Sequence, residues 1–128
     1  MSAQAELFST VPSKDIANLF KSGGDVDAER VVKLLKYKKE DVSVAAGVPI
    51  ASVRYDSKMP IDLRDRMVEW AIAINLVGTH FNDLDKALLW FQVSNPLLGN
   101  MSPKDMIRVG RFKRLLKFIQ TALDENKR

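Results

Sequence analysis

The segment 60–79 constrains the fold more than any other part of the sequence. Pro60 precedes its first turn, Asp62 and Asp65 supply the negative charge that a helix N-terminus favours, and apolar residues then occupy nearly every face. A helix that is apolar all round has to be covered by other elements on every side. Sustained alternation of apolar and polar residues, the pattern of strands, is found nowhere. We therefore predict an all-α fold packed around this helix.

Four further helices are predicted, each from apolar residues at helical spacing and from residues that favour helix starts. They run from Asp25 or Asp27 to about Tyr37, from near Asn82 or Asp83 through Phe91, from Pro103 to near Gly110, and from about Arg111 to Asp124. Between the second and the third, Asn95-Pro96 ends a helix and Gly99-Asn100 can take the positive φ of a turn. Ser102 is then placed to cap the next helix.

The residue types leave little for catalysis. The 128 residues hold no cysteine and one histidine, His80, which excludes thiolate chemistry and sulfur-ligated zinc. Ser22-Gly23-Gly24-Asp25 lacks the lysine and the length of a phosphate-binding loop. We expect no catalytic residue, no metal, no cofactor and no small-molecule substrate.

The sequence also bears on location. No apolar run approaches the roughly 18 residues that cross a bilayer, and the first ten residues lack the basic-then-apolar layout of a signal peptide. A cytoplasmic protein without a membrane partner is expected.

The formal net charge of +4 is unevenly distributed. Segment 30–58 carries seven basic and three acidic residues, and segment 104–128 carries eight basic and three acidic residues. Basic zones attract polyanions through counterion release, which is typical of nucleic-acid binding. The alternative is that these side chains only solvate helix faces.

Segment 40–53 has the spacing of a helix-turn-helix. Ser43 lies four residues before Gly47, Val48 follows the glycine, and Val53 lies six residues beyond it. The small residue lets two helices cross closely, the glycine supplies a positive φ, and the valines hold the second helix on the first. We predict that this second helix lies in the major groove of DNA.

In this interpretation the outward side chains after Pro49 face the bases, and Lys38 and Lys39 reach phosphates. Arg54 is the candidate for a bidentate contact with guanine. The predicted DNA-binding residues are Lys38, Lys39, Ser52, Arg54, Tyr55 and Lys58. A helix-turn-helix that no longer binds DNA and serves to pack or dimerise is the alternative.

Two motifs follow in the last third of the chain. Segment 87–91 reads Ala-Leu-Leu-Trp-Phe, and segment 95–103 reads Asn-Pro-Leu-Leu-Gly-Asn-Met-Ser-Pro. Together they resemble the toxin-binding domain of the Xre/MbcA/ParS antitoxins, which shows an Ala-Leu-x-Trp-Leu helix, an Asn-Pro-x-Leu-Gly-Gly turn and a Thr-Pro helix start. Asn100 stands at the second glycine of that pattern, and Ser102 stands at the threonine.

The resemblance implies a bacterial type II antitoxin that binds a RES-type toxin protein, has no catalytic role, binds operator DNA and forms a homodimer. The RES-type toxins act on NAD. The implied domains are an N-terminal arm with a short helix (1–24), an Xre-like helix-turn-helix domain (25–80) and a small helical toxin-binding domain (81–128) that shares one core with it. The predicted toxin-binding residues are Asn95, Pro96, Leu97, Leu98, Gly99, Met101, Arg111 and Arg114.

Three of these residues stand out without the resemblance. Leu97, Leu98 and Met101 are apolar in a connection that also holds proline, glycine and asparagine. We expect them to be exposed, and exposed apolar patches mark partner surfaces. Two other functions remain open, an orphan or phage-borne DNA-binding regulator of the same fold and a helical adaptor whose DNA site is defunct.

Overall fold

The computed structural model describes residues 14–126, and this part of the chain is all helical, with two isolated β-bridges and no strand. The all-α prediction is confirmed. The elements are α2 (Ala28–Leu35), α3 (Lys39–Ala46), the 3₁₀ turn η1 (Ile50–Ser52), α4 (Ile61–Phe81), α5 (Leu84–Gln92), the 3₁₀ turn η2 (Pro96–Leu98), α6 (Pro103–Arg108) and α7 (Phe112–Asn126). The helices predicted from periodicity are all present, with ends shifted by a few residues.

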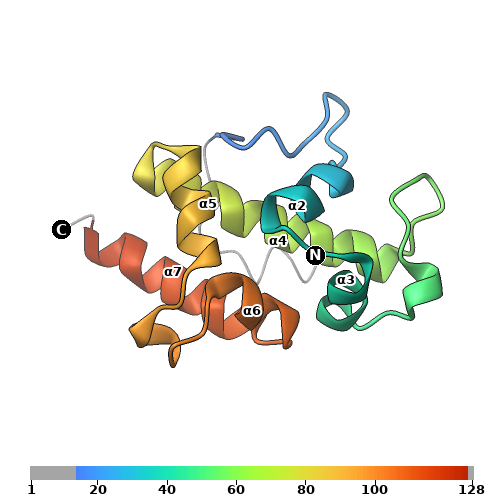
Figure 1. The fold of residues 1–128 in the computed structure, drawn as a ribbon. Coiled ribbons are helices and arrows are strands. Elements are labelled where there is room, and N and C mark those ends of the chain that lie inside the picture. The colour runs from blue at the N-terminus through green and yellow to red at the C-terminus, as the bar shows by residue number, and fades with distance from the viewer. Residues whose placement is uncertain (1–13, 127–128) are drawn as a thin grey trace.

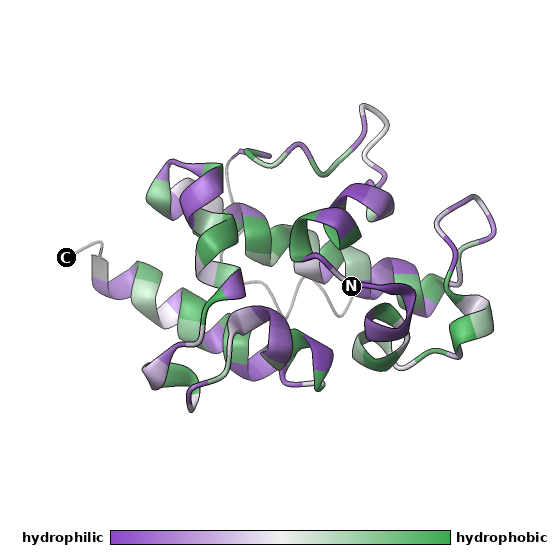
Figure 2. Cartoon of the chain, viewed as in Figure 1, coloured by the Kyte–Doolittle hydropathy of each residue, from purple (hydrophilic) through white to green (hydrophobic). Residues whose placement is uncertain are grey.

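Helix α4 is the centre of the molecule. It is 21 residues long and contacts α2, α3, α5 and α7. Figure 1 shows it running through the whole molecule, with the shorter helices arranged around it. Hydrophilic residues alternate with apolar ones in its first turns, whereas its second half is mostly hydrophobic (Figure 2). Its buried residues accordingly lie on all sides of the second half, where every residue from Ala73 to Gly78 is buried.

The segment before α2 is tied to α4 by a buried asparagine. The Asn75 side chain accepts a hydrogen bond from the Ala17 N–H (3.0 Å) and donates one to Asp15 Oδ1 (2.8 Å). The Asp15 carboxylate also accepts from the N–H groups of Leu19 and Phe20, both at 2.8 Å. Burial raises the pKa of Asp15, but these hydrogen bonds and the charge of Arg30 outweigh it, so the pKa is lowered.

The short helix expected in the N-terminal arm is not found in residues 14–24. These residues form turns, closed by a bridge between Phe20 and Val26. The local reason is that the Asp15 side chain takes the N–H groups of Leu19 and Phe20, which a helix would pair with backbone carbonyls. The rest of the arm, 1–13, lies outside the described residues.

The segments on either side of residue 80 share one core. The Tyr37 hydroxyl, at the corner between α2 and α3, donates to the carbonyl of Lys104 in α6, and the Tyr37 ring packs edge-on against Trp70 at a centroid distance of 5.9 Å. Gln92 Nε2 of α5 donates to the Leu35 carbonyl of α2 at 3.4 Å. The buried apolar side chains form a single cluster that draws on α2 through α7.

Within residues 14–126 no helix is long and apolar enough to cross a membrane.

Candidate protein-binding site

The connection between α5 and α6 is a turn closed by backbone hydrogen bonds. The Asn95 N–H donates to the Met101 carbonyl (3.0 Å), and the Asn95 carbonyl accepts from Leu98 (2.9 Å) and Asn100 (3.0 Å). The Asn95 side chain also accepts from the Leu97 N–H at 2.9 Å. With both ends of the turn bonded to each other, its backbone is held in one conformation.

Two consecutive residues of this turn take the left-handed conformation, as the sequence predicts. Gly99 has φ 67° and Asn100 has φ 66°. Glycine adopts this region freely and asparagine tolerates it, so the pair reverses the chain at low cost. Ser102 then caps α6, because its Oγ accepts from the Asp105 N–H at 3.2 Å, and Pro103 occupies the first helical position.

The apolar residues of the turn point in different directions. Leu97 is 78% exposed, whereas Leu98 is only 9% exposed and belongs to the core. Met101 is half-buried. The expectation of exposure is therefore right for Leu97 and wrong for Leu98. Successive side chains of a 3₁₀ turn are about 120° apart around its axis, and in this turn Leu98 is the one that faces the core.

The turn borders a hollow of about 330 Å³ together with α6 and α7. Arg111 and Arg114 lie on its rim, and Arg111 Nη1 lies 3.7 Å from the Met101 sulfur. Of the predicted toxin-binding residues, six line this one hollow, and Asn95 and Pro96 belong to the same turn. Met106 and Phe118 also line it, and neither is among the binding residues predicted from the sequence.

The predicted helix-turn-helix is present only in its first half. Helix α3 ends at Gly47, which takes φ 69° as predicted, and Ser43 Oγ donates to the Val48 carbonyl at 2.6 Å. The prediction of a second helix is wrong, because the chain forms a single 3₁₀ turn at Ile50–Ser52 and then becomes extended at Val53.

Three local features oppose a helix after Ser52. Val53 is buried with extended backbone. The Asp56 carboxylate accepts from the Lys58 N–H (3.0 Å) and from the Arg54 guanidinium (2.7 Å for Nε), which stabilises a turn. Pro60 disfavours helical backbone at Met59. A helix this short gains too little to overcome these preferences.

The predicted DNA-binding residues consequently do not share a helix face. Lys38 and Lys39 are exposed at the start of α3, and Arg54 and Lys58 are exposed in the connection to α4. Ser52 and Tyr55 are half-buried. Arg54 is held by Asp56 in a two-point ion pair, which lowers the pKa of the Asp56 carboxyl.

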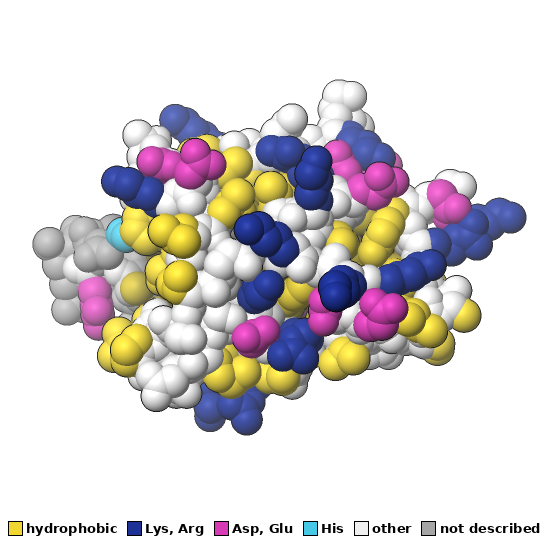
Figure 3. Space-filling model, in the orientation of Figure 1, with side chains coloured by type: hydrophobic (Ala, Val, Ile, Leu, Met, Phe, Trp, Pro, Cys, Tyr) yellow, Lys and Arg dark blue, Asp and Glu magenta, His cyan; other side chains and the backbone are white. Residues whose placement is uncertain are grey.

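One basic residue lies near this surface although nothing in the sequence indicates that it is close to α3. The hydrogen bond from Tyr37 places the backbone of Lys104 beside the start of α3, across 67 residues of sequence. Lys and Arg side chains spread over the face shared by α2, α3 and α6, with Asp and Glu side chains beside several of them (Figure 3).

No chemistry-bearing cluster accompanies these surfaces. Among residues 14–126, no group of three or more His, Cys, Asp or Glu side chains is placed to hold a metal ion. Glu69 is the one buried carboxylate of α4. Burial raises its pKa, although Arg66, whose Nη2 lies 2.9 Å from Glu69 Oε2, opposes the shift.

No protein-family model matches the sequence, and no curated protein matches it. Among solved structures, a similar chain occurs in the crystal structure of the M. tuberculosis MbcT-MbcA toxin-antitoxin complex, with a TM-score of 0.45 and 20% sequence identity. The similarity covers 73% of this chain and 87% of that chain. Because the TM-score is below 0.5, this similarity does not bear on the function of the chain.

Proposed function

We propose that the chain is the antitoxin of a type II toxin–antitoxin pair, which neutralises a RES-type, NAD-degrading toxin by binding it directly. The observation that carries the proposal is Leu97, which is 78% exposed at the tip of a turn closed by hydrogen bonds. The turn has the residues of the motif that resembles the antitoxin family. The work assigned to the chain is binding, without catalysis of its own.

An exposed leucine on a backbone held in one conformation is energetically suited to binding a partner. Burying a leucine side chain in a partner contributes roughly 1.5–3 kcal/mol. Because the backbone of the turn is already closed, little conformational freedom is lost on binding. Arg111 and Arg114 on the rim of the same hollow add planar groups that pair with carboxylates of a partner.

Co-expression with the protein encoded by the neighbouring gene tests this proposal. We expect the two proteins to co-purify as one complex, whose mass is measured by light scattering. Leu97→Asp is expected to dissociate it. The matched control is Leu89→Asp, because Leu89 is also an exposed leucine (62%) but lies on α5. Co-purification that survives Leu97→Asp, or that Leu89→Asp abolishes equally, would contradict the proposal.

We further propose that the chain, as a cytoplasmic homodimer, binds its own operator and represses its operon. The support is the group of exposed lysines at one end of the molecule, Lys38 and Lys39 at the start of α3 and Lys58 in the following connection. Without a second helix these residues would act mainly through phosphates, and Ser52, Arg54 and Tyr55 would lie beside them.

Fluorescence anisotropy with a labelled promoter duplex tests DNA binding. We expect an affinity that falls as salt rises, and a loss of affinity in the double variant Lys38→Glu/Lys39→Glu. Lys117→Glu, a charge reversal on α7, is the control. Equal binding of the promoter and a scrambled duplex would count against operator recognition. Sedimentation velocity over a range of concentrations tests the homodimer, which a constant monomer mass would contradict.

The second candidate is a helical adaptor that does not read DNA. It is favoured by the missing second helix and by the ion pair that occupies Arg54. In this case the chain still forms a complex with its toxin partner. It does not specifically retard the promoter duplex. An orphan or phage-borne regulator would specifically retard the promoter duplex and would form no complex with a toxin.

A further inference from the structure

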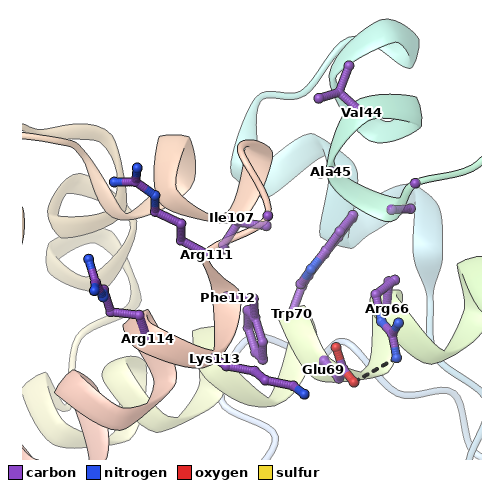
Figure 4. A pocket seen from close by; sticks show the side chains of 13 residues that line it. Val44, Ala45, Arg66, Glu69, Trp70, Ile107, Arg111, Phe112, Lys113 and Arg114 are labelled. Atoms are coloured by element: carbon purple, nitrogen blue, oxygen red, sulfur yellow. Dashed lines mark hydrogen bonds and ion pairs between the residues drawn. The ribbon is translucent and has the colours of Figure 1, made fainter.

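A second and larger hollow lies on the other side of Arg111 and Arg114. This groove, of about 1160 Å³, runs between the end of α3 and the start of α7, with α4 below it. In Figure 4, Val44 and Ala45 of α3 stand on one side and Arg111 and Arg114 on the other, with Trp70, Lys113 and Glu69 between them. No function assigned above uses this groove.

The charge along the groove is predominantly positive. Four cations line it, Arg66, Arg111, Lys113 and Arg114, against one carboxylate, Glu69, which is buried and already paired with Arg66. Three ion pairs form among residues 14–126, and none of them involves Arg111, Lys113 or Arg114. Helix α7 also begins there without an acidic residue in its first turn. Lys113 also acts to lower the pKa of the Glu69 carboxyl, so Arg111 and Arg114 are the cations of the groove that pair with no carboxylate among residues 14–126.

The opposite wall is apolar and exposed. Val44 is 62% exposed, and Ala45 and Ala46 beside it are half-buried. These three side chains form an aliphatic strip on α3 that lines the groove and is partly open to solvent. An occupant that fits both walls has aliphatic side chains along one side and negative charge along the other.

These two walls favour a protein segment over a nucleic acid. A single strand of nucleic acid gains much of its affinity by stacking bases on aromatic rings. The aromatic rings of the groove are not available for stacking, since Trp70 is 1% and Phe112 is 8% exposed. A phosphate backbone gains nothing from Val44. An amphipathic peptide uses both the aliphatic strip and the cations.

We propose that the groove between α3 and α7 receives an acidic, amphipathic segment of a partner protein. The aliphatic side chains of the segment pack on Val44 and Ala45, and its carboxylates pair with Arg111, Lys113 and Arg114. The groove shares Arg111 and Arg114 with the hollow beside the Leu97 turn, whereas Val44, Ala45 and Lys113 line the groove alone, and the proposal does not require that the partner be a toxin.

The probe is a displayed library of random 16-residue peptides, selected against the full-length chain. We expect the selected peptides to combine Asp or Glu with Leu, Ile or Val at helical spacing. The affinity of the strongest peptide is then measured by fluorescence anisotropy. Val44→Glu and Lys113→Glu should each weaken it about tenfold or more, since each places a like charge against the carboxylates.

Matched controls lie elsewhere on the surface. Leu89 is as exposed as Val44, at 62%, and Lys117 is an exposed lysine of α7 outside the groove. Leu89→Glu and Lys117→Glu should leave the peptide affinity unchanged, and circular dichroism checks that all variants are folded. A selection without acidic enrichment, or equal losses in the groove and control variants, would overturn the proposal. So would tighter binding of a single-stranded or duplex oligonucleotide that Lys113→Glu selectively weakens.

Discussion

Tyr37 donates the side-chain hydrogen bond that spans the most sequence among residues 14–126. Its hydroxyl donates to the Lys104 carbonyl, and its ring packs against Trp70. Burial raises the pKa of this phenol, and the nearby carboxylates of Asp105 and Asp41 raise it further, so the hydroxyl keeps its proton. The contact joins the corner of α2 and α3 to α6.

Tyr37→Phe is therefore expected to lower the free energy of unfolding. The substitution keeps the ring but removes the hydroxyl that donates to the Lys104 carbonyl, and we expect a loss of about 0.5–1.5 kcal/mol in the free energy of unfolding. Urea unfolding followed by circular dichroism measures it. Tyr55→Phe is the control, because Tyr55 is half-buried and makes no hydrogen bond through its hydroxyl among the described residues. Equal stability of Tyr37→Phe and the unsubstituted chain would contradict this account.

At the scale of elements, the ionised carboxylate of Asp15 stabilises the segment 14–20 on α4. The carboxylate holds the N–H groups of Leu19 and Phe20 and the amide of Asn75. The pKa of Asp15 is below its ordinary value of 3.8, so the stabilisation is present in full above that value. It is lost as the pH falls through the lowered value in the folded state.

An NMR titration of the Leu19 and Phe20 amides tests this point. We expect both amide shifts to follow a common transition with a midpoint below 3.8, and this transition to disappear in Asp15→Asn. Amide exchange at Ala17 should be faster in Asp15→Asn at neutral pH, because Asn75 loses a partner. A midpoint at or above 3.8 would show that the carboxylate does not anchor the segment.

At the scale of the whole molecule, the shared core predicts cooperative unfolding. Buried side chains from 25–80 and 81–128 form one cluster, and α3 contacts α6 while α2 contacts α5. Neither part keeps a complete core when the other unfolds, so an all-or-none transition is expected.

The two tryptophans report on the two parts separately. Trp70 lies in α4, and Trp90 of α5 stacks on Phe118 of α7 with a centroid distance of 6.4 Å. In Trp90→Phe the fluorescence comes from Trp70. We expect the midpoint of urea unfolding measured by this fluorescence to coincide with the midpoint measured by far-UV circular dichroism. The same coincidence is expected for Trp70→Phe at a lower midpoint. Two separate transitions in either variant would indicate that the parts unfold independently.

Local signals in the sequence were sufficient for the helices and for the 95–101 turn. The apolar run of α4, the Ser102-Pro103 start and the Gly99-Asn100 pair each act within a few residues of themselves. The second helix of the helix-turn-helix was predicted from spacing alone. That spacing did not include the turn around Asp56, which competes with the helix locally.

Long-range contacts had no such signal. Nothing in the sequence indicates that Tyr37 meets Lys104, that Asn75 holds the segment before α2, or that α3 and α7 form a charged groove. The orientation of Leu97 and Leu98 was also out of reach, because it depends on which side of a single 3₁₀ turn faces the core.

The central claim is that the Leu97 turn binds and neutralises a RES-type toxin. The most direct test is the rate of NAD degradation by that toxin, titrated with the purified chain and with Leu97→Asp. We predict that the chain stops NAD degradation at a near-stoichiometric ratio, and that Leu97→Asp requires about tenfold more protein or greater, as expected for loss of a central apolar contact. Undiminished NAD degradation at excess chain, or equal inhibition by Leu97→Asp, would contradict the claim.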